Sequence, residues 1–181
     1  MISRILLASV ALPLLPATAA TCESLGKLSL PGTTITTADL VSGGSFAAPG
    51  MPQPIANLPS FCRVAGTIRP SKDSEIQFEV RMPASGWNGK FFGVGNGGFA
   101  GTITYAGLAS AIRESYAAAS TDTGHQAGGQ NASWALNHPE KIVDFGHRAI
   151  HETTVKGKAI VKAFYGDAPK RSYFSWFRCE N

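Results

Sequence analysis

The chain has 181 residues, among which 16 lysines and arginines face 12 aspartates and glutamates, for a formal charge of +4. The basic residues are scattered, with no run that could follow a phosphate backbone, so the sequence excludes an ordinary nucleic-acid interface. Beyond the N-terminal segment no stretch is long and apolar enough to cross a bilayer, which excludes a membrane span. The length suffices for one domain with a real hydrophobic core.

The first 20 residues have the layout of an export signal. Arg4 supplies one positive charge, residues 5–15 are apolar apart from Ser9, and small residues fill positions 17–20. This three-part pattern predicts a signal peptide over residues 1–20 and a secreted or periplasmic protein, with the mature chain starting near Ala20 or Thr21. The alternative is a buried N-terminal strand or helix.

Three cysteines remain after the signal: Cys22, Cys62 and Cys179. An oxidising compartment permits a disulfide, and a bridge between Cys22 and Cys62 would tie the start of the mature chain to the domain. The alternative is that both are buried free thiols. Cys179 is left over and needs a partner that this chain does not contain.

Residues 21–59 are rich in Gly, Pro, Ser, Thr and Ala and predict an extended lead-in, with one strand at 33–37. Residues 76–82 alternate apolar and polar side chains, which predicts a half-buried strand. Further on, we expect a more buried strand at 90–94, a short helix at 106–114 and an inner strand at 116–120.

A longer helix follows a polar loop at 122–133. Its apolar and small residues recur at helical spacing and predict the face that packs on a sheet, namely Ile150, Thr154, Gly157, Val161 and Phe164. Gly166 is placed to cap its C-terminus, and residues 171–175 start another strand. Alternation of strands and helices after a leading hairpin predicts an α/β fold.

Two segments could carry chemistry. The glycine run Gly95–Gly101 follows a strand but lacks the spacing of a nucleotide-binding loop. Its backbone N–H groups could face a developing oxyanion, or the run could be a turn that needs positive φ angles. Asp122 and His125 lie just past the inner strand, where α/β enzymes gather site residues. We favour the interpretation that they hydrogen-bond their own loop.

His147 and His151 are four residues apart on the predicted helix, a spacing that could hold a metal ion. No glutamate lies between them to act as a base, and a closed site needs three or four ligands, so a solvated helix face is the favoured interpretation. No Gly-x-Ser-x-Gly elbow occurs in the chain, and no Ser/His/Asp set can be assembled from local context.

Several segments in the same order resemble the tannase and feruloyl esterase family: residues 61–68, 81–83, 86–92, the glycine run to Gly101, 119–125 and 164–175. The resemblance implies an α/β-hydrolase core with a mixed sheet and flanking helices. It also implies a small ester of an aromatic acid as substrate, and in full-length relatives an inserted lid domain that often binds calcium. By resemblance, Gly98 supplies an oxyanion-hole N–H, and Cys22 and Cys62 match the N-terminal disulfide pair. Asp122 and His125 match a recurring motif, without an assigned catalytic step.

The resemblance stops after Ser175. The family continues there with Gly-Cys-Ser-x-Gly-Gly, the elbow that carries the nucleophile, whereas this sequence continues Trp-Phe-Arg-Cys-Glu-Asn. Arg178 stands at the nucleophile position. We therefore expect residues 60–175 to be the N-terminal part of an α/β-hydrolase domain, with an off-pattern tail at 176–181. On this interpretation the lid, the C-terminal half and the Ser/Asp/His triad are absent, and the truncated chain is inactive by itself.

Two further hypotheses stay open. The chain could be a secreted, non-catalytic binding module that retains the glycine loop as part of a pocket for phenolic or sugar-ester ligands. It could also be an unrelated small extracellular domain with an accidental motif match; a disulfide between Cys22 and Cys62 would count against that hypothesis.

Overall fold

The computed structural model describes residues 20–176. A mixed six-stranded sheet forms its centre, with strand order β1-β4-β5-β7-β6-β8. The strands are β1 (Thr33–Val41), β4 (Phe61–Ile68), β5 (Ile76–Pro83), β6 (Lys90–Val94), β7 (Ala117–Thr121) and β8 (Arg171–Ser175). The first four in this order pair antiparallel, and β6 pairs parallel with both β7 and β8. A two-stranded ribbon of β2 (Gly44–Phe46) and β3 (Ile55–Leu58) lies outside this sheet.

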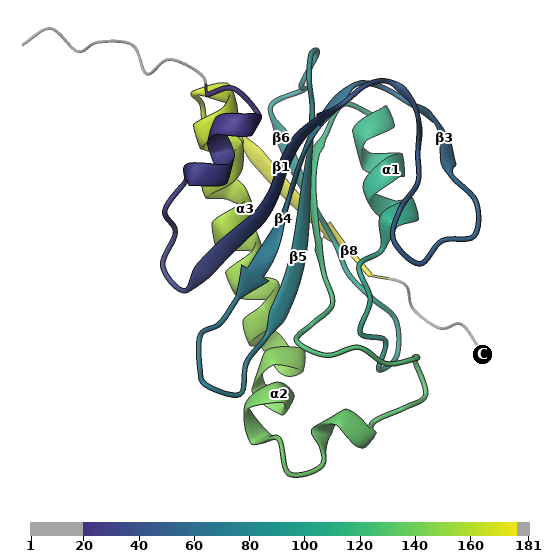
Figure 1. Cartoon of the computed structure of the whole chain (residues 1–181), viewed down its shortest axis with the longest axis vertical. Coiled ribbons are helices and arrows are strands. Elements are labelled where there is room, and N and C mark those ends of the chain that lie inside the picture. The colour runs from purple at the N-terminus through teal and green to yellow at the C-terminus, as the bar shows by residue number, and fades with distance from the viewer. Residues whose placement is uncertain (1–19, 177–181) are drawn as a thin grey trace, which may run out of the picture.

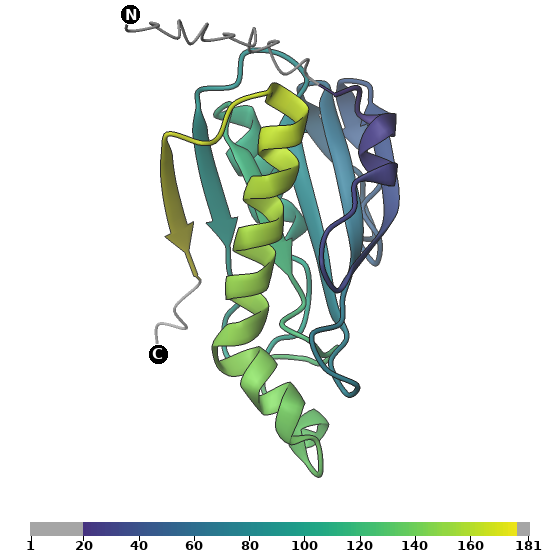
Figure 2. The same cartoon turned by 90° about the vertical axis from the view of Figure 1, so that its left-hand side faces the viewer.

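Helices cover both faces of the sheet (Figure 1). The helix α1 (Tyr105–Arg113) connects β6 to β7 and packs on one face, and α3 (Ala149–Tyr165) connects β7 to β8 and packs on the other. Shorter turns complete the chain: η1 (Glu23–Lys27), η2 (Ser133–Ala135), α2 (Pro139–Val143) and the π-helical turn η3 (Asp144–Arg148). Figure 2 shows α3 running along the sheet and continuing through η3 and α2 beyond its edge.

Most of the expected elements are confirmed, and the strands at 90–94 and 171–175 match residue for residue. The strand expected at 33–37 extends to Val41 and pairs along its whole length with β4, so part of the lead-in is an edge strand of the main sheet. The signal expected over residues 1–20 lies almost entirely outside the described residues. Cys179 and nearly all of the tail at 176–181 also lie outside them.

The prediction that 76–82 is a half-buried strand is wrong. In β5 every residue except Gln77 is buried. Its apolar residues face the α3 side, where Phe78 and Val80 join the main core. Its charged residues Glu79 and Arg81 are fully buried as well, because they form ion pairs rather than contacting water. Alternation of apolar and polar residues does not distinguish a strand with one face in water from a strand whose charged face is buried in ion pairs.

The buried stripe of α3 is rotated relative to the prediction. Gly157 and Val161 are buried as expected, but the stripe continues through Ala149, Thr153 and Ile160. A Cβ added at Gly157 would lie 3.1 Å from the Phe91 ring, so the expected close approach of helix and sheet is confirmed. Gly166 caps the helix in the left-handed conformation, with φ of 81°.

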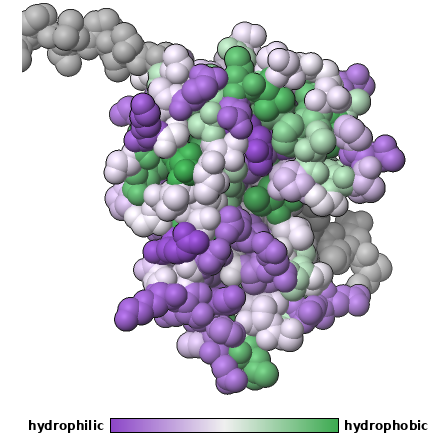
Figure 3. Space-filling view, in the orientation of Figure 1, coloured by the Kyte–Doolittle hydropathy of each residue, from purple (hydrophilic) through white to green (hydrophobic). Residues whose placement is uncertain are grey.

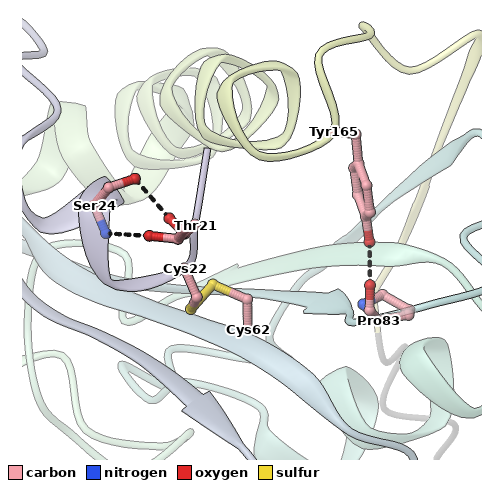
Figure 4. The surroundings of a disulfide bond; sticks show 6 residues. All are labelled: Thr21, Cys22, Ser24, Cys62, Pro83 and Tyr165. Atoms are coloured by element: carbon pink, nitrogen blue, oxygen red, sulfur yellow. Dashed lines mark hydrogen bonds between the residues drawn. A yellow bond between two sulfur atoms is a disulfide. The ribbon is translucent and has the colours of Figure 1, made fainter. Parts of the chain in front are cut away.

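A disulfide joins Cys22, just before η1, to Cys62 in β4 (Figure 4). Both cysteines are buried within the core on the α3 side. The bridge fastens the first described residues to the centre of the sheet. In Figure 3, hydrophilic side chains dominate the lower half of the face shown, and a small hydrophobic patch lies at its lowest end, where Figure 1 places α2.

Candidate functional site

The candidate site lies where the parallel strands β6, β7 and β8 end. The glycine run follows β6, Asp122 and His125 follow β7, and Trp176 follows β8. In α/β proteins the crevice outside the carboxyl ends of the strands is where ligands bind. The sheet topology therefore brings together the two segments that the sequence singled out.

The glycine run is held in place by several hydrogen bonds. The Asn96 side chain donates to the carbonyl of Thr121 over 3.0 Å and accepts from the Thr104 hydroxyl over 2.9 Å. The N–H of Phe99 donates to the Gly129 carbonyl over 2.8 Å. Gly98 has a φ of 58°, and an added Cβ would lie 2.7 Å from that same carbonyl oxygen. The loop thus requires glycine here for both its conformation and its space.

The N–H of Gly98 takes part in no hydrogen bond among the described residues. Gly98 lines a groove of about 540 Å³ whose other walls come from η3, the start of α3, and the end of β8. Three aromatic side chains contribute, namely Phe145, Phe174 and Trp176. An unpartnered donor in a pinned loop is what stabilisation of an oxyanion needs, because the donor does not have to reorganise during the reaction.

Asp122 and His125 hold their loops, as the favoured interpretation of the sequence has it. One Asp122 oxygen accepts the N–H groups of Gln77 and Gly124, each over 2.9 Å. Burial of the carboxyl group raises the pKa of Asp122 to about 7. The His125 ring nitrogen Nε2 donates to the carbonyl of Phe99 over 2.8 Å, which joins the loop after β7 to the glycine run.

His125 is itself fixed by packing. Its ring is buried and stacks on Trp134 with centroids 3.9 Å apart, and Phe145 meets it edge to face. This link between the two motifs could not be predicted from the sequence, because local patterns carry no information about which loops meet at the sheet edge.

His147 and His151 are exposed and lie along the groove, on η3 and α3. No three His, Cys, Asp or Glu side chains gather anywhere within residues 20–176. No helix within the same range combines the length and hydropathy needed to cross a membrane.

The sequence also missed a cluster on the α1 side of the sheet. Glu79 lies between Arg63 and Arg81 and forms ion pairs with both, over 2.8 and 2.7 Å. The signal was present as charged residues at alternate positions, Glu79 and Arg81, of the strand predicted at 76–82, but exposure was the simpler interpretation of that pattern.

The family model described as tannase and feruloyl esterase matches residues 62–177. The chain belongs to this family. The resemblance inferred from the motifs is thereby confirmed, and the hypothesis of an unrelated extracellular domain is wrong.

Relatives within the tannase and feruloyl esterase family include bacterial and fungal proteins. An uncharacterized esterase of Xanthomonas campestris is 48% identical over 155 residues, covering 86% of this chain and 27% of the relative. A probable feruloyl esterase B-1 of Aspergillus fumigatus is 40% identical over 114 residues, covering 63% of this chain and 21% of the relative. The chain thus spans about a quarter of the length of these relatives.

Solved structures of family members share the fold. Feruloyl esterase B from Aspergillus oryzae superposes with a TM-score of 0.78 at 30% identity, covering 86% of this chain and 31% of the other. A tannin acyl hydrolase from Aspergillus niger superposes with a TM-score of 0.60 at 22% identity, which supports the fold alone. The α/β-hydrolase core with a mixed sheet and flanking helices, present in part, is confirmed.

Proposed function

We propose that this chain provides the N-terminal part of the α/β-hydrolase domain of an exported carboxylic ester hydrolase. The substrates would be small esters of aromatic acids, attacked by a serine nucleophile that residues 1–181 do not supply. Membership of an esterase family supports the reaction class. The observation that carries the proposal is the N–H of Gly98, which has no hydrogen-bond partner within residues 20–176 and lies in a groove beside the end of β8.

Gly98 would donate to the oxygen that becomes negative when the ester carbonyl is attacked. Its loop is pinned through Asn96, Phe99 and His125, so the donor keeps its place as charge develops. The aromatic acyl group would lie along Phe145 and Trp176 in the same groove. In this arrangement the chain binds the substrate and stabilises charge, but it does not attack the carbonyl carbon.

Residues 1–181 contain no Gly-x-Ser-x-Gly elbow, and by resemblance the nucleophile position follows Ser175. We infer that the 181-residue polypeptide alone does not hydrolyse esters, because acyl transfer without nucleophile and base loses most of its rate enhancement. The test is an assay of the purified chain on methyl ferulate and methyl gallate beside a buffer control. Turnover that persists through a second purification would contradict this inference.

The role of Gly98 is tested in a chimera that joins residues 21–175 to the remaining C-terminal part of the matching Xanthomonas esterase. We expect it to hydrolyse methyl ferulate, and Gly98→Ala to lower kcat on the order of a hundredfold. The added Cβ would collide with Gly129 and displace the loop, whereas Gly128→Ala meets nothing within 4 Å and is the matched control. Equal activity of the two variants would refute the assignment of Gly98.

A second candidate function is a non-catalytic binding module for phenolic or sugar-ester ligands. It is favoured by the size and aromatic lining of the groove. In that case the 181-residue chain should melt cooperatively and bind methyl ferulate saturably, and Trp176→Ala should weaken binding on the order of tenfold. Binding that Trp176→Ala leaves unchanged would argue against this groove.

We also propose export to the periplasm or medium, with residues 1–20 as the signal. The disulfide between Cys22 and Cys62 supports an oxidising compartment. N-terminal sequencing of the exported protein should give a first residue near Ala20 or Thr21. Recovery of the full-length chain, starting at Met1, from the cytosol would contradict the proposal.

A further inference from the structure

A second cavity, of about 640 Å³, lies on the α1 side of the sheet. Its floor is formed by β4 and β5, and its walls by residues 49–51, 101–105 and 122–127. None of its lining residues lines the groove at Gly98. The proposed ester hydrolysis makes no use of this cavity.

The ion-pair cluster at the floor of this cavity contains two positive groups and one negative group: Arg63 and Glu79 line the cavity, and Arg81 is buried behind them. Arg63 and Arg81 stand directly opposite each other across β4 and β5, a placement that is unfavourable for like charges. Glu79 compensates in part, with one oxygen bound by each arginine. Two guanidinium groups thus share a single carboxylate that is itself fully buried.

Arg81 is the more deeply placed of the two arginines. Its side chain is 0% exposed, yet Nη1 and Nη2 have no hydrogen-bond partner among the described residues. The rings of Phe46 and Phe61 lie 4.6 and 5.1 Å from its guanidinium carbon and attract the cation, but they supply no negative charge. The positive charge is therefore held in a poorly solvated place without a full counter-charge.

Arg63 and Tyr105 present donors to the cavity itself. The Arg63 side chain is 18% exposed and uses Nε and Nη2 for Glu79, while Nη1 binds no described residue. Burial raises the pKa of Tyr105, so its hydroxyl stays protonated and can donate. Ala65 and Ile103 add apolar surface to the same lining.

Asp122 is the acidic group on the opposite wall of the cavity. One of its oxygens is engaged by the N–H groups of Gln77 and Gly124, and its pKa is raised to about 7 by burial. At about pH 6 this carboxyl is mostly neutral and does not cancel the excess of positive charge.

We propose that this cavity binds a small organic carboxylate, with the anion on Arg63 and Tyr105 and the apolar body against Ala65 and Ile103. A carboxylate supplies the missing negative charge, and a guanidinium edge and a phenol are donors that match its geometry. The site is separate from the ester site, and its ligand does not have to be a substrate.

The experiment is calorimetric titration of the purified 181-residue chain with benzoate at about pH 6 and constant ionic strength, beside the neutral isostere benzamide. We expect saturable binding of one benzoate and on the order of tenfold weaker binding of benzamide. Equal affinities for the two, or heat without saturation, would overturn the proposal.

Substitutions of residues that line the cavity test whether benzoate binds there. Arg63→Gln should weaken benzoate binding on the order of tenfold, and Tyr105→Phe should weaken it severalfold. Arg69→Gln is the matched control, because Arg69 is exposed, forms an ion pair with exposed Glu75 and does not line the cavity. A thermal melt of each variant checks folding, and Tyr105→Phe serves if Arg63→Gln does not fold. Equal losses for Arg63→Gln and Arg69→Gln would overturn the proposal.

A variant in the groove at Gly98 distinguishes failure of this proposal from failure of the proposed ester site. Trp176→Ala, in the groove at Gly98, should leave benzoate binding unchanged. If Trp176→Ala abolishes benzoate binding while Arg63→Gln and Tyr105→Phe retain it, the carboxylate sits in the groove. That result would refute this proposal and leave the proposed ester hydrolase intact.

Discussion

The two faces of β5 are buried to a similar degree, but different interactions hold them. Toward α3, Phe78 and Val80 pack in an apolar core that also contains the disulfide. Toward α1, Glu79 and Arg81 are equally buried, and ion pairs and aromatic rings surround them. Burial alone therefore does not say which kind of interaction stabilises a strand.

The two sides of the sheet also differ in their roles. The α3 side is packed with apolar side chains and cross-linked by the disulfide, which suits a structural scaffold. The α1 side holds a charged cavity next to the segment that follows the glycine run. We expect substitutions on the two sides to cost similar amounts of unfolding free energy. The costs should differ more in how they depend on pH and salt.

The largest expected effect comes from removing the centre of the charged side. Glu79→Ala leaves two buried arginines without a counter-charge, and we expect a loss of about 3–5 kcal/mol in the free energy of unfolding. Urea denaturation measures it. Glu75→Ala is the control, since Glu75 is exposed and its pair with Arg69 contributes little. If the two variants are equally stable, the ion pairs do not hold this side.

Removing the disulfide on the α3 side should lower the free energy of unfolding nearly as much. Cys22 and Cys62 are 40 residues apart in sequence, and closing a loop of that length stabilises a fold by up to about 4 kcal/mol. The double variant Cys22→Ala/Cys62→Ala should lose about 2–4 kcal/mol, with little dependence on salt. Reduced wild-type protein is the control and should show a similar loss. A loss of under about 0.5 kcal/mol would show that core packing alone holds η1.

A series of stability measurements at different pH values tests the buried carboxyl group of Asp122, which lines the cavity on the α1 side. The folded pKa of Asp122, about 7, lies above its ordinary value of 3.8, so its protonated form favours folding. This contribution is complete below about pH 4 and is lost as the pH rises toward 7. Between about pH 4 and pH 6 wild type should lose about 2 kcal/mol relative to Asp122→Asn, which keeps an oxygen acceptor. Parallel stability curves for the two proteins would contradict the assignment.

The sequence predicted the parts of the fold that depend on local pattern. The strand at 90–94, the strand at 171–175 and the cap at Gly166 follow from apolar runs and glycine placement. The buried state of Glu79 and Arg81 could not be predicted, because an ion pair across strands and a solvated face give the same alternation.

The candidate site was predictable only in its pieces. The glycine run and the His125 loop were each singled out, but the hydrogen bond from His125 to Phe99 depends on how the sheet brings two loops together. The role of Gly98 came from family resemblance, and the structure adds that its N–H is unpartnered among the described residues.

The smallest expected effect concerns a single polar contact on the α3 side. Tyr165, at the end of α3, stacks on Trp87. Its hydroxyl donates to the Pro83 carbonyl at the end of β5 over 2.7 Å (Figure 4). Tyr165→Phe keeps the stack and removes the donor, so we expect a loss of about 1 kcal/mol in urea denaturation. Tyr173→Phe is the matched control, because Tyr173 is 43% exposed. If Tyr165→Phe costs no more than this control, packing on Trp87 and not the hydrogen bond fixes the end of α3, and the α3 side is stabilised by apolar contact even at a partly buried polar group.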